Sequence, residues 1–440
     1  MISSFLFSIL LFSMPAEPTA EDEVLSEFRT IEKGKTEQVD FPKNEILNPI
    51  MIACTDKAIA LSNIFKPTYL SLYDYRNRSF VGQFLHAGRG ADEVSMMMTF
   101  KSESDGFHFW DPNKHLLSSV KADTPWLISK SVSFAKANDQ IFKVYRLNDD
   151  MSLGTGPFKG RPFAILDNTA DSITTLFGSY PLPEDNLNDS QKAYACQWNC
   201  HYNPDLKRMA AATTCGSFIA FCDLKDMDEP VLIRRKGNIL PKFEKSKGGT
   251  VKFLPDNIYG FIDVAGNYHY CVALYWGQTY NDFPTGLFGG NILLIYDWEG
   301  HPIKAIRLKR VYRAITIMPD SDIIFLVGKN GEYWRIDSLN LKIKMPEPIL
   351  ENRVLERHDT RPSVQNVLLG QGFEGPRCRS GTTDMVFVHC LRTCYCFLPS
   401  NDGMKVANLL ECESFNKIGE QETELLDEGF MRLDNNLLGT

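Results

Sequence analysis

The chain has 440 residues, and 47 Lys and Arg against 55 Asp and Glu give a formal net charge of −8. Hydrophobic residues make up 43% and charged residues 23%, which is typical of a folded globular protein and excludes a disordered, collagenous or multi-span membrane chain. The acidic balance also argues against a nucleic-acid partner, because that binding needs clustered Lys and Arg.

The first 20 residues predict a secretory signal peptide. The run from Phe5 to Met14 is apolar, but it is too short to cross a bilayer core, which needs roughly 20 apolar residues. Small residues and prolines follow, then an acidic stretch, so we expect cleavage after Ala16 or Ala20. The alternative is a buried N-terminal helix or strand. We expect no lipid-anchoring Cys after this run and no transmembrane span in the mature chain.

One pattern recurs along the rest of the chain. An apolar run ends in Asp, a few turn residues follow, and a second alternating run begins, as expected of a β-hairpin. The six hairpins carry the aspartates Asp74, Asp111, Asp167, Asp223, Asp297 and Asp337. A carboxylate at this position can accept hydrogen bonds from the N–H groups of its own turn. Their regular recurrence therefore indicates turn geometry and not catalysis.

Four short strands fit the first repeat, PIMIAC, AIALSNIF, TYLSLYD and SFVGQF, within about 40 residues, the unit of a β-propeller blade. Six hairpins predict an all-β, six-bladed propeller over residues 21–345, with insertions at 181–191 and 278–290. A β-sandwich or two unrelated β domains is the alternative. Residues 346–440 form a C-terminal extension of uncertain structure, in which MVFVHCLRTCYCFL either completes the last blade or belongs to an added module.

Three segments resemble the bacterial, exported, six-bladed TolB-like β-propeller family. The first is the export segment followed by the TYLSLYD hairpin, and the second is HAGRGADEV, which resembles a Gly-rich acidic segment of the family. The third is RAITIMPDSDIIFLVGKNGEYWRID, which looks like a terminal blade. The resemblance covers roughly residues 45–345. It implies the propeller fold and export to the periplasm or cell surface of a Gram-negative bacterium, and no specific activity.

The Gly-rich segment offers the first candidate site. Arg89, Asp92 and Glu93 are its groups able to line a ligand site. A phosphate loop would need a following helix or a Lys-Ser/Thr pair, and the two acidic residues would repel an anion. The expected role of Gly88 and Gly90 is a turn between blades, with the glycines at positive φ.

The second candidate site is aromatic. The inserted sequence LYWGQTYNDF carries Trp276, Tyr280 and Phe283, which either stack on a sugar or dock a peptide, or else cover a blade edge.

Cys196 and Cys200 with His201 resemble half of a zinc site, but structural zinc favours closer pairs and four ligands. We therefore predict no metal and no cofactor.

No nucleophile elbow, zinc-protease motif or Walker loop occurs in the sequence. This favours a binding or interaction module at the cell envelope that holds a peptide, protein or glycan at one end of the central channel. The alternative is a hydrolase or lyase with dispersed catalytic residues in the channel. Convergent His, Asp, Glu and Arg side chains with shifted pKa values at the channel mouth would favour the enzyme.

Overall fold

The computed structural model describes two parts of the chain. The first is residues 24–343 without 40, 42–48, 64–67, 91–92, 104–105, 122–127, 138–140, 184–185, 284–286, 319 and 332, and the second is residues 377–380, 383–390, 393–400 and 403–408. The predicted signal peptide lies outside these residues. The chain divides into two compact units, Met1–Pro348 and Ile349–Thr440.

Four sheets of the first unit are antiparallel and each contains four consecutive strands. We call them blades I to IV. The strands are β3 (Pro49–Cys54), β4 (Ala58–Asn63), β5 (Thr68–Asp74) and β6 (Phe80–His86) in blade I; β7 (Thr99–Ser102), β8 (Gly106–Asp111), β9 (Leu116–Lys121) and β10 (Ile128–Ser133) in blade II; β11 (Lys143–Arg146), β12 (Met151–Phe158), β13 (Arg161–Asp167) and β14 (Ser172–Phe177) in blade III; and β15 (Trp198–Asn203), β16 (Arg208–Thr213), β17 (Ile219–Asp223) and β18 (Val231–Lys236) in blade IV.

An eight-stranded sheet supplies two further blades, V and VI, that share one long strand. Its strands are β21 (Ile258–Gly266), β22 (Tyr270–Thr279), β23 (Gly290–Asp297), β24 (Pro302–Ile317), β25 (Ile323–Asn330), β26 (Tyr333–Asn340), β1 (Ile31–Gly34) and β2 (Glu37–Gln38). The first half of β24 pairs with β23 as the outer strand of blade V. Its second half pairs with β25 as the inner strand of blade VI.

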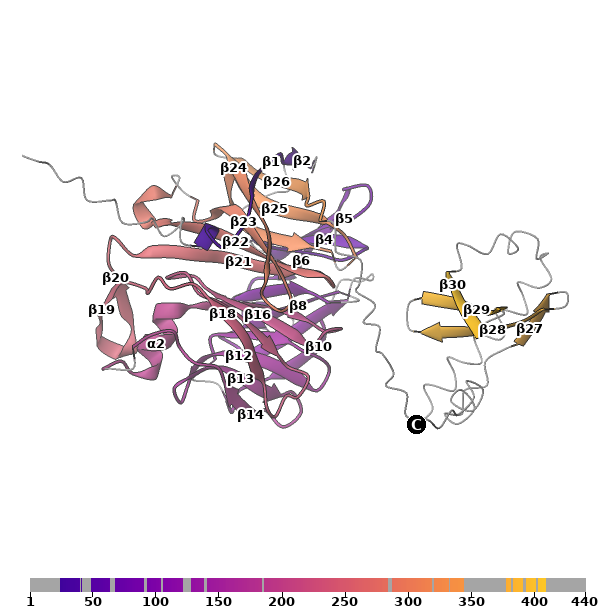
Figure 1. Cartoon of the computed structure of the whole chain (residues 1–440). Coiled ribbons are helices and arrows are strands. Elements are labelled where there is room, and N and C mark those ends of the chain that lie inside the picture. Colours follow the sequence, from indigo (N-terminus) through magenta and orange to yellow (C-terminus); the bar gives the residue numbers. More distant parts are fainter. Residues whose placement is uncertain are drawn as a thin grey trace, which may run out of the picture. The chain divides into compact units, whose positions relative to one another are not determined.

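The N-terminal strands complete the ring. β2 pairs antiparallel with β26 as the outer strand of blade VI, and β1 pairs in parallel with β24 (Figure 1). The inner strands β3, β7, β11, β15, β21 and β24 each contact the next, and β24 contacts β3. This closed ring confirms the predicted all-β, six-bladed propeller and excludes the β-sandwich.

The core of the propeller lies between its blades. Six clusters of buried apolar side chains occur in the described residues, and each fills the space between two neighbouring blades. Between blades II and III, for example, Trp110 and Leu117 pack with Val144 and Phe158. Since each sheet packs against a neighbour on both of its faces, middle strands such as β4 and β8 are buried along their whole length.

The inner strands end on one common face. The N–H of Cys54, at the end of β3, donates to Ser102 Oγ at the end of β7 (3.1 Å), and Asn203 Nδ2, at the end of β15, donates to the carbonyl of Asn267 (3.3 Å). The connections that follow the inner strands therefore gather there. We call this side, with residues 55–57, 103, 147–150, 204–207, 267–269, 318 and 320–322, the inner-turn face.

The repeated aspartates follow the prediction in part. Asp74, Asp167, Asp223 and Asp297 end the third strand of their blades and accept hydrogen bonds from the N–H groups of the turn that follows. Asp111 ends the second strand of its blade, β8, and accepts from the N–H of Asn113 in the turn and also from Ser95. The turn assignment is wrong for Asp337, which lies inside β26, fully buried, with Arg335 and Tyr312 as partners.

Helical structure is confined to the connections. α2 (Asp189–Cys196) precedes blade IV, and Asn188 and Gln191 form its capping box. α2 contacts β12 and β20 (Val251–Phe253), and β20 pairs with β19 (Phe243–Lys245) (Figure 1). The short 3₁₀ helices are η2 (Lys247–Gly249) and η3 (Tyr280–Asp282). Among the described residues, no helix is long and apolar enough to span a membrane.

The second unit contains a four-stranded antiparallel sheet of its own. Its consecutive strands are β27 (Arg377–Ser380), β28 (Thr383–Cys390), β29 (Thr393–Ser400) and β30 (Gly403–Asn408). The MVFVHCLRTCYCFL sequence forms the β28–β29 hairpin of this sheet. It does not complete blade VI, where β2 takes that position.

Candidate functional site

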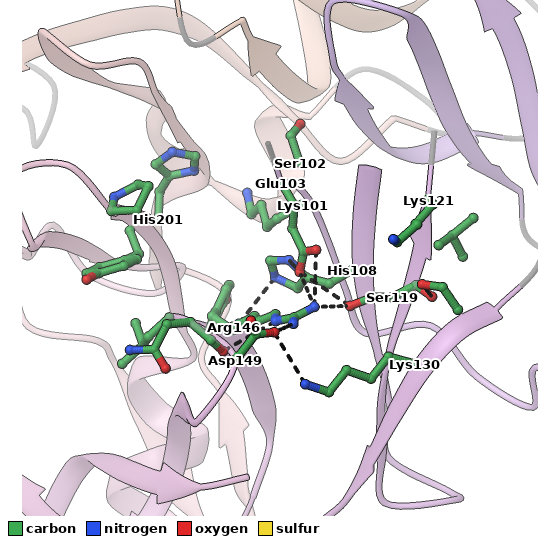
Figure 2. A pocket seen from close by; sticks show the side chains of 17 residues that line it. Lys101, Ser102, Glu103, His108, Ser119, Lys121, Lys130, Arg146, Asp149 and His201 are labelled. Atoms are coloured by element: carbon green, nitrogen blue, oxygen red, sulfur yellow. Dashed lines mark hydrogen bonds and ion pairs between the residues drawn. The ribbon is translucent and has the colours of Figure 1, made fainter. Parts of the chain in front are cut away.

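A cavity of about 770 Å³ opens on the inner-turn face, where blades II, III and IV meet. Blade II contributes residues of all four strands, blade III contributes the end of β11 and the turn after it, and blade IV contributes the end of β15. The charged and histidine side chains of the lining are Lys101, Glu103, His108, Lys121, Lys130, Arg146, Asp149 and His201 (Figure 2).

Arg146 is the centre of the polar network. Its Nη1 lies 3.3 Å from both carboxylate oxygens of Glu103 and donates to Ser119 Oγ at 2.6 Å. Its Nη2 donates to Asp149 Oδ1, and Nε donates to the carbonyl of Asn148 (3.3 Å) (Figure 2). The guanidinium is therefore held from the blade II side and from its own turn, in a fixed orientation.

His108 is engaged at both ring nitrogens. Nδ1 lies 3.2 Å from Glu103 Oε1, and Nε2 accepts from the backbone N–H of Arg146 at 3.4 Å. Since Nε2 accepts a hydrogen bond, the neutral ring carries its proton on Nδ1, facing the carboxylate. Neither nitrogen is left to take a proton from a ligand in the cavity.

Glu103 is mostly buried, with 16% of its side chain exposed. Burial raises the pKa of this carboxyl, but its hydrogen bonds with His108 and Arg146 and the electrostatic attraction of these side chains outweigh burial and hold its pKa below the usual range. Glu103 is consequently an ionised acceptor at neutral pH, not a proton donor.

Two lysines point into the channel behind the cavity. Lys101 Nζ pairs with Asp263 Oδ1 (3.0 Å) across the ring and donates to the carbonyl of Val264 (2.8 Å). Lys143 Nζ donates to Asn199 Oδ1 and to the carbonyl of Trp198. Burial lowers the pKa of Lys143 to about 8. These contacts join blade II to blade V and blade III to blade IV.

His201 closes the cavity on the blade IV side. Its ring stacks on Trp298, with 6.1 Å between ring centroids. Burial, with the nearby Lys101 and His108, lowers the pKa of His201 to about 3, so the ring is neutral at physiological pH. An imidazole with so low a pKa is a poor general base.

The rim of the cavity carries the exposed charges. Lys130 Nζ pairs with Asp149 Oδ1 at 3.3 Å, and their side chains are 47% and 77% exposed. Lys121 lies at the exposed end of β9. In the described lining the cations Lys101, Lys121, Lys130 and Arg146 outnumber the anions Glu103 and Asp149. The cavity is therefore electropositive in an acidic protein.

None of the sequence-predicted site residues lines this cavity. Arg89 is exposed in the connection before β7, on the face opposite the inner-turn face, and Asp92 lies outside the described residues. Glu93 Oε2 accepts from the N–H of Gly90 (2.7 Å). Neither Gly88 nor Gly90 has positive φ, contrary to the prediction. A Cβ on Gly88 would lie 1.9 Å from Glu93 Oε2, so the flexible Glu93 side chain would have to move aside.

The aromatic candidates do lie together, also on the opposite face, in the last residues of β22 and directly after it. Trp276 and Phe283 stack with 4.9 Å between centroids, and Tyr280 meets the edge of Phe283 at 6.0 Å. Trp276 is buried and Tyr280 is 62% exposed. Most of the cluster packs on itself over the end of blade V, and its role as a ligand site stays a prediction.

The cysteine segment carries no metal-site geometry. Cys196 ends α2, Cys200 lies in β15, and both are buried free thiols. Burial holds the pKa of Cys200 well above its ordinary value, which keeps it protonated. In the part of the chain that the structure describes, no three His, Cys, Asp or Glu side chains gather as metal ligands would.

Sequence reasoning missed the cavity residues because they are separated along the chain. Glu103 directly follows β7, Arg146 ends β11, and His201 lies two residues before the end of β15. Charged residues at the ends of the first strands of successive blades were the available signal, since these strands line the channel of a propeller.

Comparison with known proteins agrees with the fold. The model of a family described as "TolB-like 6-blade propeller-like" matches residues 28–320. Curated protein sequences give no match. Among solved structures, a member of the duf4221 family from Bacteroides vulgatus is similar, with 12% identity, a TM-score of 0.45 and coverage of 70% of this chain and 98% of that one. The β-propeller domain of Cps50 (Swd1) from Myceliophteria thermophila has 11% identity and a TM-score of 0.38, covering 70% and 99%.

Proposed function

The chain belongs to the TolB-like six-blade propeller-like family, and from this premise we propose that it is an exported binding module of the cell envelope whose site is the cavity on the inner-turn face. The ligand is a peptide or a segment of a protein. One observation carries the proposal: an electropositive cavity of about 770 Å³ whose acid–base groups are already engaged with one another.

The lining supports binding more than turnover. Glu103 is ionised and shared between Arg146 and His108, and both nitrogens of His108 are engaged. General acid–base catalysis needs a group that can exchange a proton with the ligand near the working pH. The fixed charges serve instead to orient a polar ligand.

A peptide suits the cavity better than a glycan. Sugar sites typically present flat aromatic rings, whereas Tyr145 is buried here and the ring of His201 already stacks on Trp298. Val120, Leu147 and Pro204 give the lining an apolar part beside its charges. An apolar wall with a few placed polar groups is typical of a site for a peptide side chain.

The rival function is a hydrolase or lyase, and one observation favours it. His108, Glu103, Arg146 and Asp149 converge at the channel mouth, and the pKa values of Glu103, Asp149 and His201 are all lowered. If these groups were catalytic, His108→Gln would abolish turnover of a peptide or glycan substrate. Under the binding proposal, incubation with envelope extract leaves the bound component chemically unchanged, as mass spectrometry would show.

The binding proposal is tested by removing the rim cations. We expect Lys121→Gln with Lys130→Gln to weaken the binding of an acidic peptide about tenfold in a fluorescence anisotropy titration, because exposed charges steer and hold an anionic ligand. The matched control, Lys252→Gln with Lys309→Gln, removes the same charge from exposed positions that do not line the cavity. Equal weakening in both double variants would contradict this site.

Export is the second part of the proposal. The TolB-like family is associated with periplasmic proteins. Cleavage after Ala16 or Ala20 would leave intact the segment that begins at Val24 and packs into the propeller core. We expect the protein in a Gram-negative host to occur in the periplasmic fraction without its first 16 to 20 residues. N-terminal sequencing that finds Met1, or recovery only from the cytosol, would rule export out.

A further inference from the structure

Asp149 occupies an unusual place in the cavity. Its Oδ1 accepts a hydrogen bond from Arg146 Nη2 and lies 3.3 Å from Lys130 Nζ, although the side chain is 77% exposed (Figure 2). The hydrogen bonds and charges of Lys130 and Arg146 hold the pKa of Asp149 below its usual range. A carboxylate is thus the group that these two cations accommodate.

The two sides of the Arg146 guanidinium are held differently. Nη1 is fixed by the mostly buried Glu103 and by Ser119, while Nη2 faces the exposed Asp149. If Asp149 moved away, Glu103 and Ser119 would keep the guanidinium in place. Nη2 would then remain aimed into the cavity, a prepositioned donor for another carboxylate.

Displacing Asp149 costs the fold little. The Lys130–Asp149 pair joins two exposed side chains and contributes little to stability, because water and salt compete with it. Arg146 is only 17% exposed, but it keeps Glu103 and Ser119 as partners when Asp149 leaves. The neighbouring main chain is held independently, since Asn148 Oδ1 accepts from the N–H groups of Asp150 and Met151 (both 2.8 Å). The side chain can therefore turn to solvent while the turn keeps its shape.

We propose that Asp149 is an internal competitor, which holds the place where a carboxylate of an acidic peptide binds to Arg146 and Lys130. This inference rests on the proposed function and narrows its ligand to a peptide with Asp, Glu or a C-terminal carboxylate. When the peptide binds, its carboxylate takes the place of the Asp149 carboxylate at Arg146 and Lys130. Asp149 therefore lowers the affinity for acidic peptides, and it disfavours neutral peptides because they have no carboxylate to replace it.

The test uses a fluorescein-labelled glutamate hexapeptide, with the glutamine hexapeptide as the neutral probe, in anisotropy titrations at low salt. We expect Asp149→Asn to bind the glutamate peptide about threefold more tightly, an effect of the size that an exposed charge pair allows. Asp149→Glu, which keeps the competing carboxylate, should stay near the wild type. The glutamine peptide should bind weakly to all variants.

Asp150→Asn is the matched control, since it removes the same charge from the next, exposed residue, which does not line the cavity. An equal gain in both Asn variants, or no gain at Asp149, would overturn the competitor role. The proposed site would still stand if binding depended on Lys121 and Lys130. Absence of glutamate-peptide binding in every variant would overturn both.

Discussion

Glu103 shows how single residues shape the candidate site. It accepts from Arg146 Nη1 at 3.3 Å and lies 3.2 Å from His108 Nδ1. Burial alone would raise the pKa of the carboxyl, but His108 and Arg146 lower it. A carboxyl whose pKa is lower in the folded state adds stability above its unfolded pKa, about 4.3, and this stability is lost as the pH falls through the folded value.

We therefore expect Glu103→Gln to reduce the free energy of unfolding at pH 7 by about 2 kcal/mol, since it leaves Arg146 and His108 without their charged acceptor. The difference from the wild type should shrink in acid, because protonation removes the same charge. Urea unfolding at pH 7 and near pH 3 measures both values. Glu229→Gln, at an exposed position, is the control, and a difference independent of pH would refute this account.

At the scale of residues, the sequence predicts hydrogen bonds between residues that are close together in the chain. Asp74 and Asp297 accept from their own turns, as a short Asp-turn motif implies. Asp337 ends an apolar run of the same kind, but its partner Tyr312 comes from another strand of the blade. The cavity could not be predicted for a similar reason, because Glu103 meets Arg146 only once two blades are packed together.

At the scale of elements, close approach between strands and connections restricts the chain. Gly237 follows β18 at φ +91°, and a Cβ there would lie 1.5 Å from the carbonyl oxygen of Ser217. Gly248 has a similar φ of +75°, but its Cβ would meet no atom within 4 Å. A side chain at Gly248 would therefore cause backbone strain alone, whereas a side chain at Gly237 would cause backbone strain and a steric clash.

We expect Gly248→Ala to cost about 1 kcal/mol, the strain of a left-handed residue with a side chain. Gly237→Ala adds a clash with backbone and should cost at least about 3 kcal/mol, or prevent folding of blade IV. Thermal unfolding followed by circular dichroism compares the two variants. Similar melting temperatures would mean that the Ser217 connection moves freely, contrary to the structure.

Whole strands were predicted where the apolar pattern is strong. Blade I follows the sequence closely, whereas in blade VI the strand β26 continues through Asp337 and the outer strand is β2. β1 and β2 escaped prediction because IEKG and EQ are short, polar and exposed, as edge strands often are. Their place is decided by the open edges of β24 and β26, which only the closed ring creates.

At the scale of the whole molecule, the ring is stabilised by six clusters between blades, so every interface must be filled. The N-terminal segment helps to fill the interface between blades IV and V. Val24, Leu25 and Phe28 are each at most 8% exposed, and Phe28 meets the ring of Tyr296 at 5.2 Å. Glu27 also pairs with Lys236 at 2.6 Å. This segment belongs to the folded ring even though it precedes the first strand.

Two shortened chains test this. A chain that begins at Glu21 keeps the whole segment and should unfold at the same temperature as the wild type. A chain that begins at Arg29 keeps β1 and β2 but loses three buried apolar side chains, each contributing roughly 1.5–3 kcal/mol, so we expect its free energy of unfolding to fall by about 4 kcal/mol. Phe28→Ala alone should account for about half of that loss. Equal stability of the two chains would show that blades IV and V pack without the segment, and that the ring is closed by β1 and β2 alone.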